Sequence, residues 1–296
     1  NPKPEFIGLR ARFFGSFEFY RTAIYKNIAN EICEQRLLTD EILSKLIKVE
    51  CISSYPFGKI LAEHMNREEQ IDFIDKYINI LNHEEEANIS ILCDFISSIN
   101  NDVFDIVIPT LQKSRISYTI FACLGIRNIL PDDKEFSLLH KMVEEKYSDI
   151  SSYLQYWSRI RQDCMTENRL LLLFKDVLSF EDGLPVAVSV MSFLLWNNHI
   201  LSYSQLIDLV EAKIVSYHLS GKSILKINNA MMICKEFIRD GSRRTLASVI
   251  NEAIILAASQ NDYHIVSHNY DTEEVYRILM NKYFDVIWPS LSQALL

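Results

Sequence analysis

The chain has 296 residues, of which 49% are hydrophobic, and only 7 are glycine and 7 are proline. So few turn-forming residues disfavour a many-stranded fold or a long flexible linker, and the apolar content is ample for a buried core. The net charge of −9 is concentrated in residues 30–105, where 16 Asp and Glu face 6 Lys and Arg, which makes this part a poor surface for nucleic acid. A solvated acidic face that keeps the protein in solution is the more ordinary meaning of the surplus.

Nothing in the sequence predicts a membrane association. No apolar run reaches the roughly 20 residues that a membrane-spanning helix needs, and the longest, Leu184–Trp196, contains two serines and is predicted to be a buried helix. The chain begins with Asn1 and not with methionine, so we expect a processed product or an excerpt of a larger protein. Six scattered cysteines without a CxxC pair are expected to be reduced, which favours a cytoplasmic location.

Along the first third, apolar residues recur at three- and four-residue steps, as they do on one face of a helix. The aromatic-rich stretch Phe13–Tyr20 leads into a helix that is predicted to run from about Ser16 to Gln35, and its rings are expected in the core. Four further helices are predicted after Thr39, from Pro56 to Met65, after the N-cap residue Asn66, and from a first turn formed by Glu84–Glu86.

The central stretch Asp102–Pro131 is predicted to form two short helices back to back, the first of them kinked at Pro109. Its segment FDIVIPTL, Phe104–Leu111, has an echo 180 residues later in FDVIWPSL, Phe284–Leu291. That offset holds five units of about 36 residues, within the range of helical repeat proteins.

The remaining stripes also predict helices. They lie around Phe136–Val143, Ile150–Trp157 and Leu170–Phe174, and further helices start near Tyr203, Ser223 and Arg243. Gly221 and Gly241 stand where glycine supplies the left-handed stop of a helix. Residues 261–269 are predicted to be a loop, and a final helix is predicted from Asp271 to the end, bent at Pro289.

The proline-bent helix with Pro109, followed by Ala122-x-Leu124-Gly125, resembles the repeats of HEAT-like and armadillo-like α-solenoids. The chain departs from the HEAT pattern in its turn, Lys113-Ser114-Arg115, and in the second helix, which starts Ile116-Ser117 and lacks a Val-Arg pair. The resemblance implies an all-α fold in which five to seven helical hairpins stack into a right-handed superhelix. It predicts a single repeat domain over residues 1–296.

Candidate catalytic and metal-binding motifs are weak. His264 and His268 have the spacing of two ligands on a helix but no third ligand nearby. Asp132 and Asp133 suggest an aspartate-rich magnesium motif, yet its fifth position is Phe136, and their place at a helix start suits capping equally well. The sequence contains no phosphate-binding glycine loop and no nucleophile elbow. We therefore predict no metal site and no cofactor.

One constellation suits partner binding: Tyr153, Tyr156, Trp157 and Arg161, residue types that dominate binding hot spots. The alternative is that Tyr153 and Trp157 belong to the core stripe of their helix. A basic set offers the best hint of a phosphate-bearing partner, although its members do not share one helix face and a solvated surface is the preferred interpretation: Lys222, Lys226, Lys235, Arg239, Arg243 and Arg244.

The sequence thus predicts a non-catalytic scaffold that docks a protein partner on the concave face of a helical superhelix. It would serve as a binding platform or as the sensor or regulatory repeat region of a multidomain protein. Two alternatives stay open. One is a HEAT-like superhelix that binds nucleic acid, and the other is an all-helical metal-dependent enzyme built around Asp132 and Asp133.

Overall fold

The computed structural model describes residues 24, 26–35, 37–48, 57–84, 89–196, 203–260 and 270–295. Every regular element in these ranges is a helix, and no strand occurs in them, which confirms the all-α prediction. The helices fall into two compact units, Asn1–Ile129 with Lys146–Arg161 and Leu130–Glu145 with Gln162–Leu296. The aromatic stretch Phe13–Tyr20 and the loop predicted at residues 261–269 lie outside the described residues.

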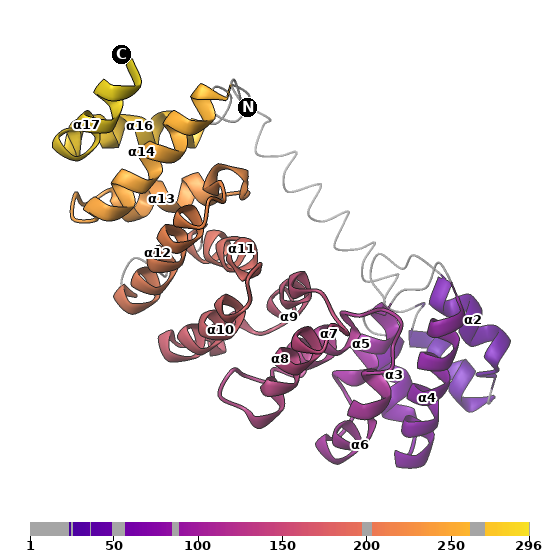
Figure 1. Cartoon of the computed structure of the whole chain (residues 1–296). Coiled ribbons are helices and arrows are strands. Elements are labelled where there is room, and N and C mark those ends of the chain that lie inside the picture. The colour runs from indigo at the N-terminus through magenta and orange to yellow at the C-terminus, as the bar shows by residue number, and fades with distance from the viewer. Residues whose placement is uncertain are drawn as a thin grey trace, which may run out of the picture. The chain divides into compact units, whose positions relative to one another are not determined.

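The helices of the first unit pack in two rows. The unit contains α2 (Asp40–Lys48), α3 (Phe57–His64), α4 (Arg67–His83), α5 (Ser90–Ile96), α6 (Asn101–Leu111), α7 (Thr119–Ile126), the 3-10 turn η2 (Ile150–Ser152) and α9 (Tyr153–Trp157). In one row α2 packs on α4 and α4 on α6, and in the other α3 packs on α5, α5 on α7 and α7 on α9. Figure 1 shows both rows, with α2 in indigo and α9 in magenta. Within each row a helix therefore contacts the next helix but one along the chain.

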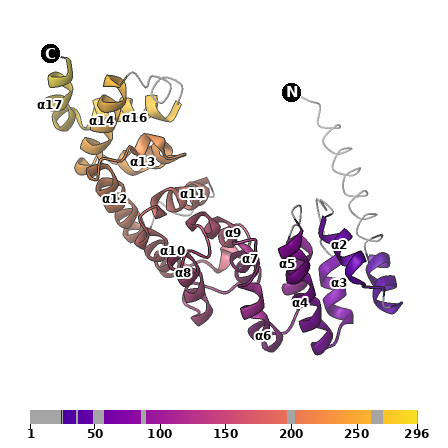
Figure 2. The same ribbon diagram turned by 45° about the vertical axis from the view of Figure 1, so that its right-hand side comes forward.

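The second unit repeats this pattern. It contains η1 (Lys134–Phe136), α8 (Ser137–Glu144), η3 (Gln162–Cys164), α10 (Glu167–Ser179), α11 (Gly183–Trp196), α12 (Ser204–Leu219), η4 (Ile224–Lys226), α13 (Ala230–Ile238), α14 (Arg244–Ser259), α16 (Tyr270–Lys282) and α17 (Phe284–Leu295). One row joins α10, α12, α14 and α17, and the other joins α11, α13 and α16 (Figure 2). Helix α11 is buried along most of its length, as predicted.

Polar side chains tie successive hairpins together, and several of these bonds span 35 or 36 residues. The Thr110 hydroxyl donates to Asp75, 35 residues away, and Lys235 contacts Asp271 at 2.6 Å, 36 residues away. The backbone carbonyl of Leu178 accepts a hydrogen bond from Lys213 at a separation of 35 residues. Other bonds between helices span 31 and 45 residues, so the hairpins differ in length.

Helix α4 begins with the cap that the sequence predicts. The Asn66 side chain accepts hydrogen bonds from the backbone of Glu68 and Glu69, and Glu69 in turn accepts one from the Asn66 backbone, which completes a capping box. The prediction for Glu84 is wrong, because this residue ends α4 and does not open the next helix. Its carboxylate instead contacts Lys48 at 2.7 Å and accepts from Ser44. Glu84 thus makes contacts with α2 and does not serve as a first-turn residue of the next helix.

Backbone conformation fixes several helix ends. Gly221 (φ 82°) and Gly241 (φ 89°) are left-handed just after α12 and α13, as predicted. The helix predicted near Ser223 starts as the 3-10 turn η4 at Ile224 but does not continue, because Asn229 is left-handed (φ 64°) and α13 begins only at Ala230. Asparagine is one of the few residues that tolerate this conformation. Lys226 and Lys235 therefore lie on separate elements.

The last predicted helix is two helices. Tyr283 separates α16 from α17, and its buried hydroxyl donates to the carbonyl of Ile238 at 2.9 Å and accepts from the backbone of Arg243. The helix is interrupted at Tyr283, where this side chain is anchored on α13. Pro289 does not end a helix but lies inside α17, just as Pro109 lies inside α6. The two halves of the sequence echo thus occupy matching helices, each with an internal proline.

Small residues let helices approach closely, as the resemblance implies for the Ala122-x-Leu124-Gly125 step. Ala122 and Gly125 are buried in α7, and a Cβ atom on Gly125 would lie 2.5 Å from the carbonyl oxygen of Tyr156 on α9. Gly58 on α3 is packed as closely, because a Cβ atom there would lie 2.3 Å from the carbonyl oxygen of Ile91 on α5.

In the parts of the chain that the structure describes, no helix has the length and apolar character to cross a bilayer.

The carboxylate of Asp149 caps the turn that leads into α9, and it gives a pH-dependent prediction. It accepts a hydrogen bond from the backbone of Ser151 at 2.8 Å, and hydrogen bonds from Ser151 hold the pKa of Asp149 below its usual value. A group with a lowered folded pKa stabilises the protein above its unfolded pKa, about 3.9, and loses this effect as the pH falls through the folded value. We expect Asp149→Ala to lower the free energy of unfolding by about 1 kcal/mol at pH 7.

Urea unfolding at several pH values, followed by circular dichroism, measures the effect. The deficit of Asp149→Ala should shrink below about pH 4, while Asp149→Asn, which keeps a capping oxygen, should stay near the parent at neutral pH. A deficit that is the same at pH 7 and in acid would contradict a role for the charged carboxylate.

Candidate binding pocket

The predicted hot-spot aromatics are core residues. Tyr153, Tyr156 and Trp157 on α9 are only 1%, 0% and 5% exposed. The Tyr156 hydroxyl donates to the carbonyl of Ile129 at 2.8 Å, and the Tyr153 ring meets Phe121 edge-on with centroids 5.2 Å apart. A hot spot must be presented to a partner, so the core alternative replaces the binding interpretation for these three rings.

Arg161 is the exposed member of the predicted set, and it lies beyond the end of α9. Its backbone N–H donates to the Asn128 side chain at 2.8 Å, a bond between neighbouring hairpins 33 residues apart. The four predicted residues are therefore close along the chain, but they do not form one exposed surface.

The acidic pair at residues 132 and 133 is occupied by structural bonds. Asp132 contacts Arg169 at 2.8 Å, and this guanidinium holds the pKa of the carboxyl below its usual value. Asp133 accepts from the backbone of Leu130 at 2.6 Å. Among the described residues no group of three or more His, Cys, Asp and Glu side chains is arranged to hold a metal ion. His264 and His268 lie outside those residues.

In the described parts of the chain, five of the six residues of the basic set, all except Lys226, lie within ion-pair distance of carboxylates. Lys235 lies between Asp271 and Glu274 at 2.6 and 3.0 Å. Ion pairs also join Lys222 to Glu181 and Asp182, Arg239 to Glu236, Arg243 to Asp208 and Glu211, and Arg244 to Asp285. Phosphate groups would have to compete with these partners, so the arrangement favours an ion-paired face over a nucleic-acid surface.

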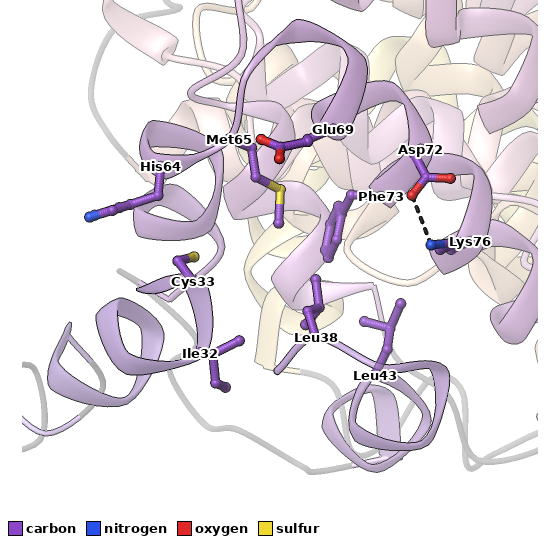
Figure 3. A pocket seen from close by; sticks show the side chains of 10 residues that line it. All are labelled: Ile32, Cys33, Leu38, Leu43, His64, Met65, Glu69, Asp72, Phe73 and Lys76. Atoms are coloured by element: carbon purple, nitrogen blue, oxygen red, sulfur yellow. Dashed lines mark ion pairs between the residues drawn. The ribbon is translucent and has the colours of Figure 1, made fainter. Parts of the chain in front are cut away.

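A cavity of about 240 Å³ opens in the first unit, between the helical residues 26–34, α2, the end of α3 and α4. Figure 3 shows its apolar side chains turned toward one another. Phe73 and Leu43 are each only 2% exposed and form the floor. Its other lining residues are Ile32, Cys33, Leu38, His64, Met65, Glu69, Asp72 and Lys76.

Charged groups stand at the edge of this cavity, which we call the α4 pocket. Asp72 contacts Lys76 at 2.8 Å, and this hydrogen bond raises the pKa of Lys76, with a smaller contribution from nearby Asp40. Burial raises the pKa of the Cys33 thiol, and the charges of Glu69 and Glu34 raise it further. Cys33 is thus held as a neutral thiol, which is a poor nucleophile. The pocket is suited to binding and not to thiol chemistry.

Sequence reasoning missed the α4 pocket. Its lining residues come from separate segments spread over residues 32–76. The sequence assigns Leu43 to a core stripe and places Asp72 and Lys76 on the solvent face of their helix, so nothing in the pattern brings them together. The signal that was available is the acidic surplus of residues 30–105, the stretch of sequence that contains the lining residues.

No family model, curated protein or solved structure matches this chain.

Proposed function

We propose that the protein is a non-catalytic helical-repeat platform that docks a protein partner. In this proposal the hairpins stack as a right-handed α-solenoid of the HEAT or armadillo kind, and the partner lies along its concave face. The observation that carries the proposal is the double row of helices in each of the two units, in which helices of one row contact the next but one along the chain and polar bonds join side chains 35 or 36 residues apart.

Such stacking supports a binding role for a physical reason. In a stack each hairpin buries its apolar face against its neighbours only, so the surface grows with the number of repeats and offers an extended wall for a partner. The two acidic residues of the candidate metal motif already have partners: Asp132 is ion-paired with Arg169, and Asp133 accepts a hydrogen bond from the backbone of Leu130. A cytoplasmic setting belongs to the same proposal, because the described cysteines are free thiols.

The proposed architecture predicts an extended molecule in solution. A compact domain of this length has a radius of gyration of about 19 Å, and a stack of hairpins must exceed that value. Small-angle X-ray scattering measures the radius directly, together with sedimentation to establish that the sample is monomeric. A monomer with a radius at the compact value contradicts a solenoid.

The proposed activity is tested by selection from a random peptide library displayed on phage, with the full chain as bait. We expect a recurrent sequence motif whose synthetic peptides bind saturably in calorimetry. Short DNA and RNA duplexes and single strands, tested by mobility shift at several salt concentrations, examine the nucleic-acid alternative. Tight binding to them with a steep salt dependence would replace the proposal. Metal analysis of the purified protein tests the alternative of a metal-dependent enzyme, which requires a stoichiometric bound metal.

A further inference from the structure

The size of the α4 pocket restricts what it can hold. Drug-sized ligands and cofactors occupy pockets of about 300–1,000 Å³, and the cavity here is about 240 Å³. An apolar cavity of roughly 150 Å³ accommodates benzene. The pocket therefore has room for one aromatic or large aliphatic side chain, as an anchor residue of a peptide would supply.

The walls suit such an anchor. Phe73 and Leu43 line the bottom, and Ile32, Leu38 and Met65 lie around it from separate segments (Figure 3). Burying an aromatic side chain against such a surface removes apolar area from water, which favours binding. An aromatic anchor in a pocket is the usual centre of a peptide-binding hot spot.

The edge of the pocket selects the residues beside the anchor. Glu69 and Asp72 line it, Glu34 acts on the Cys33 thiol, and Asp40 acts on Lys76. Among the lining residues, Glu69 and Asp72 are acidic and Lys76 is basic, and the Asp72 carboxylate is paired with Lys76 at 2.8 Å. Residues 30–105, the stretch of sequence that contains these groups, hold 16 acidic residues against 6 basic ones. A cationic segment would be attracted and oriented there.

We propose that the α4 pocket binds a basic peptide segment of a protein partner, with one aromatic side chain inserted over Phe73 and flanking lysines or arginines on the acidic edge. This rests on the proposed function and names its partner chemistry. A second copy of the chain is disfavoured as the occupant, because two copies would bring like acidic regions together. Nucleic acid is disfavoured for the same reason.

The test uses the full chain and rhodamine-labelled synthetic peptides in fluorescence anisotropy. The probe is Lys-Arg-Ser-Trp-Ser-Arg-Lys. One comparison peptide replaces its tryptophan by alanine, and another replaces its four basic residues by glutamate. We expect saturable binding of the probe, a loss of about 30-fold without the tryptophan, and no detectable binding of the acidic peptide. The absence of saturable probe binding up to about 1 mM overturns the proposal.

Matched variants locate the site. Cys33→Phe and, independently, Met65→Phe fill the pocket and should weaken probe binding at least about tenfold. Cys164→Phe makes the same change at another half-buried cysteine, in the second unit, and should have no effect. Asp72→Asn should weaken binding about threefold at low salt, whereas Asp105→Asn on α6 removes an equal charge outside the lining and should not. Circular dichroism establishes that each variant is folded.

The outcomes separate the pocket from the platform. Probe binding that both filling variants leave unchanged overturns the pocket proposal. The same holds for a dimer in sedimentation that Cys33→Phe dissociates, because the occupant would then be a second copy. Phage selection repeated on Cys33→Phe tests the proposed function separately. If the pocket proposal has failed, peptides that still bind this variant support a binding platform that uses another surface.

Discussion

Replacing Trp157 by alanine is expected to lower the free energy of unfolding by about 3–5 kcal/mol, as for other buried large side chains. Trp157 is 5% exposed and lies at the end of α9, which packs against α7. Truncation removes a large apolar surface and leaves a cavity that the neighbouring backbone cannot fill, because α7 and α9 already touch at Gly125. Urea unfolding followed by circular dichroism measures the change.

Two variants on the same stretch calibrate the result. Arg161→Ala changes an exposed side chain and should stay within about 0.5 kcal/mol of the parent. Tyr156→Phe keeps the buried ring but removes the hydrogen bond to Ile129, and should cost about 1 kcal/mol. The core assignment fails if Trp157→Ala keeps the parent stability and instead abolishes binding of a partner peptide, as a surface hot spot would.

Local signals in the sequence determine several features of the fold. Asn66 followed by Glu69 forms a capping box from side chains three residues apart, so a short window suffices to predict it. Gly221 and Gly241 end helices because glycine alone takes a positive φ without steric cost. The apolar stripes place most helices correctly, since a helix packed on others must bury one face whatever its neighbours are.

The errors share a different physical origin. Tyr283 divides the last predicted helix because its hydroxyl bonds to Ile238, 45 residues earlier. Glu84 ends a helix and is held by Lys48 and Ser44 from α2. No window of a few residues contains these partners, so propensity and periodicity could not reveal them. The burial of Tyr156, whose hydroxyl bonds to Ile129, was hidden for the same reason.

The α4 pocket was beyond sequence reasoning because a cavity is a defect in packing between elements. Leu43 and Phe73 have the spacing of ordinary core residues, and only the relative placement of α2 and α4 leaves space above them. The charges at its edge were visible as a local acidic surplus. The sequence therefore indicates that the region of the site is negatively charged, but it does not indicate where the pocket lies.

Gly125→Ala is expected to lower the free energy of unfolding by about 1–3 kcal/mol. Two effects oppose each other at this position. Alanine favours a helix over glycine by about 1 kcal/mol, but its Cβ would lie 2.5 Å from the carbonyl oxygen of Tyr156. The atom that is met belongs to the backbone of α9, so no side-chain rotation relieves the overlap and the two helices must move apart. Steric cost therefore exceeds the gain in propensity.

The control is Gly221, where no atom lies within 4 Å of an added Cβ but φ is 82°. Gly221→Ala should cost about 1–2 kcal/mol from backbone conformation alone, and Gly221→Asn should recover most of it because asparagine tolerates the left-handed region. At Gly125 the loss of stability depends on side-chain volume, so Gly125→Asn should lower the free energy of unfolding more than Gly125→Ala. Stabilisation by Gly125→Ala in urea unfolding would show that α7 and α9 separate freely, and it would refute the close packing on which the stacking of these hairpins depends.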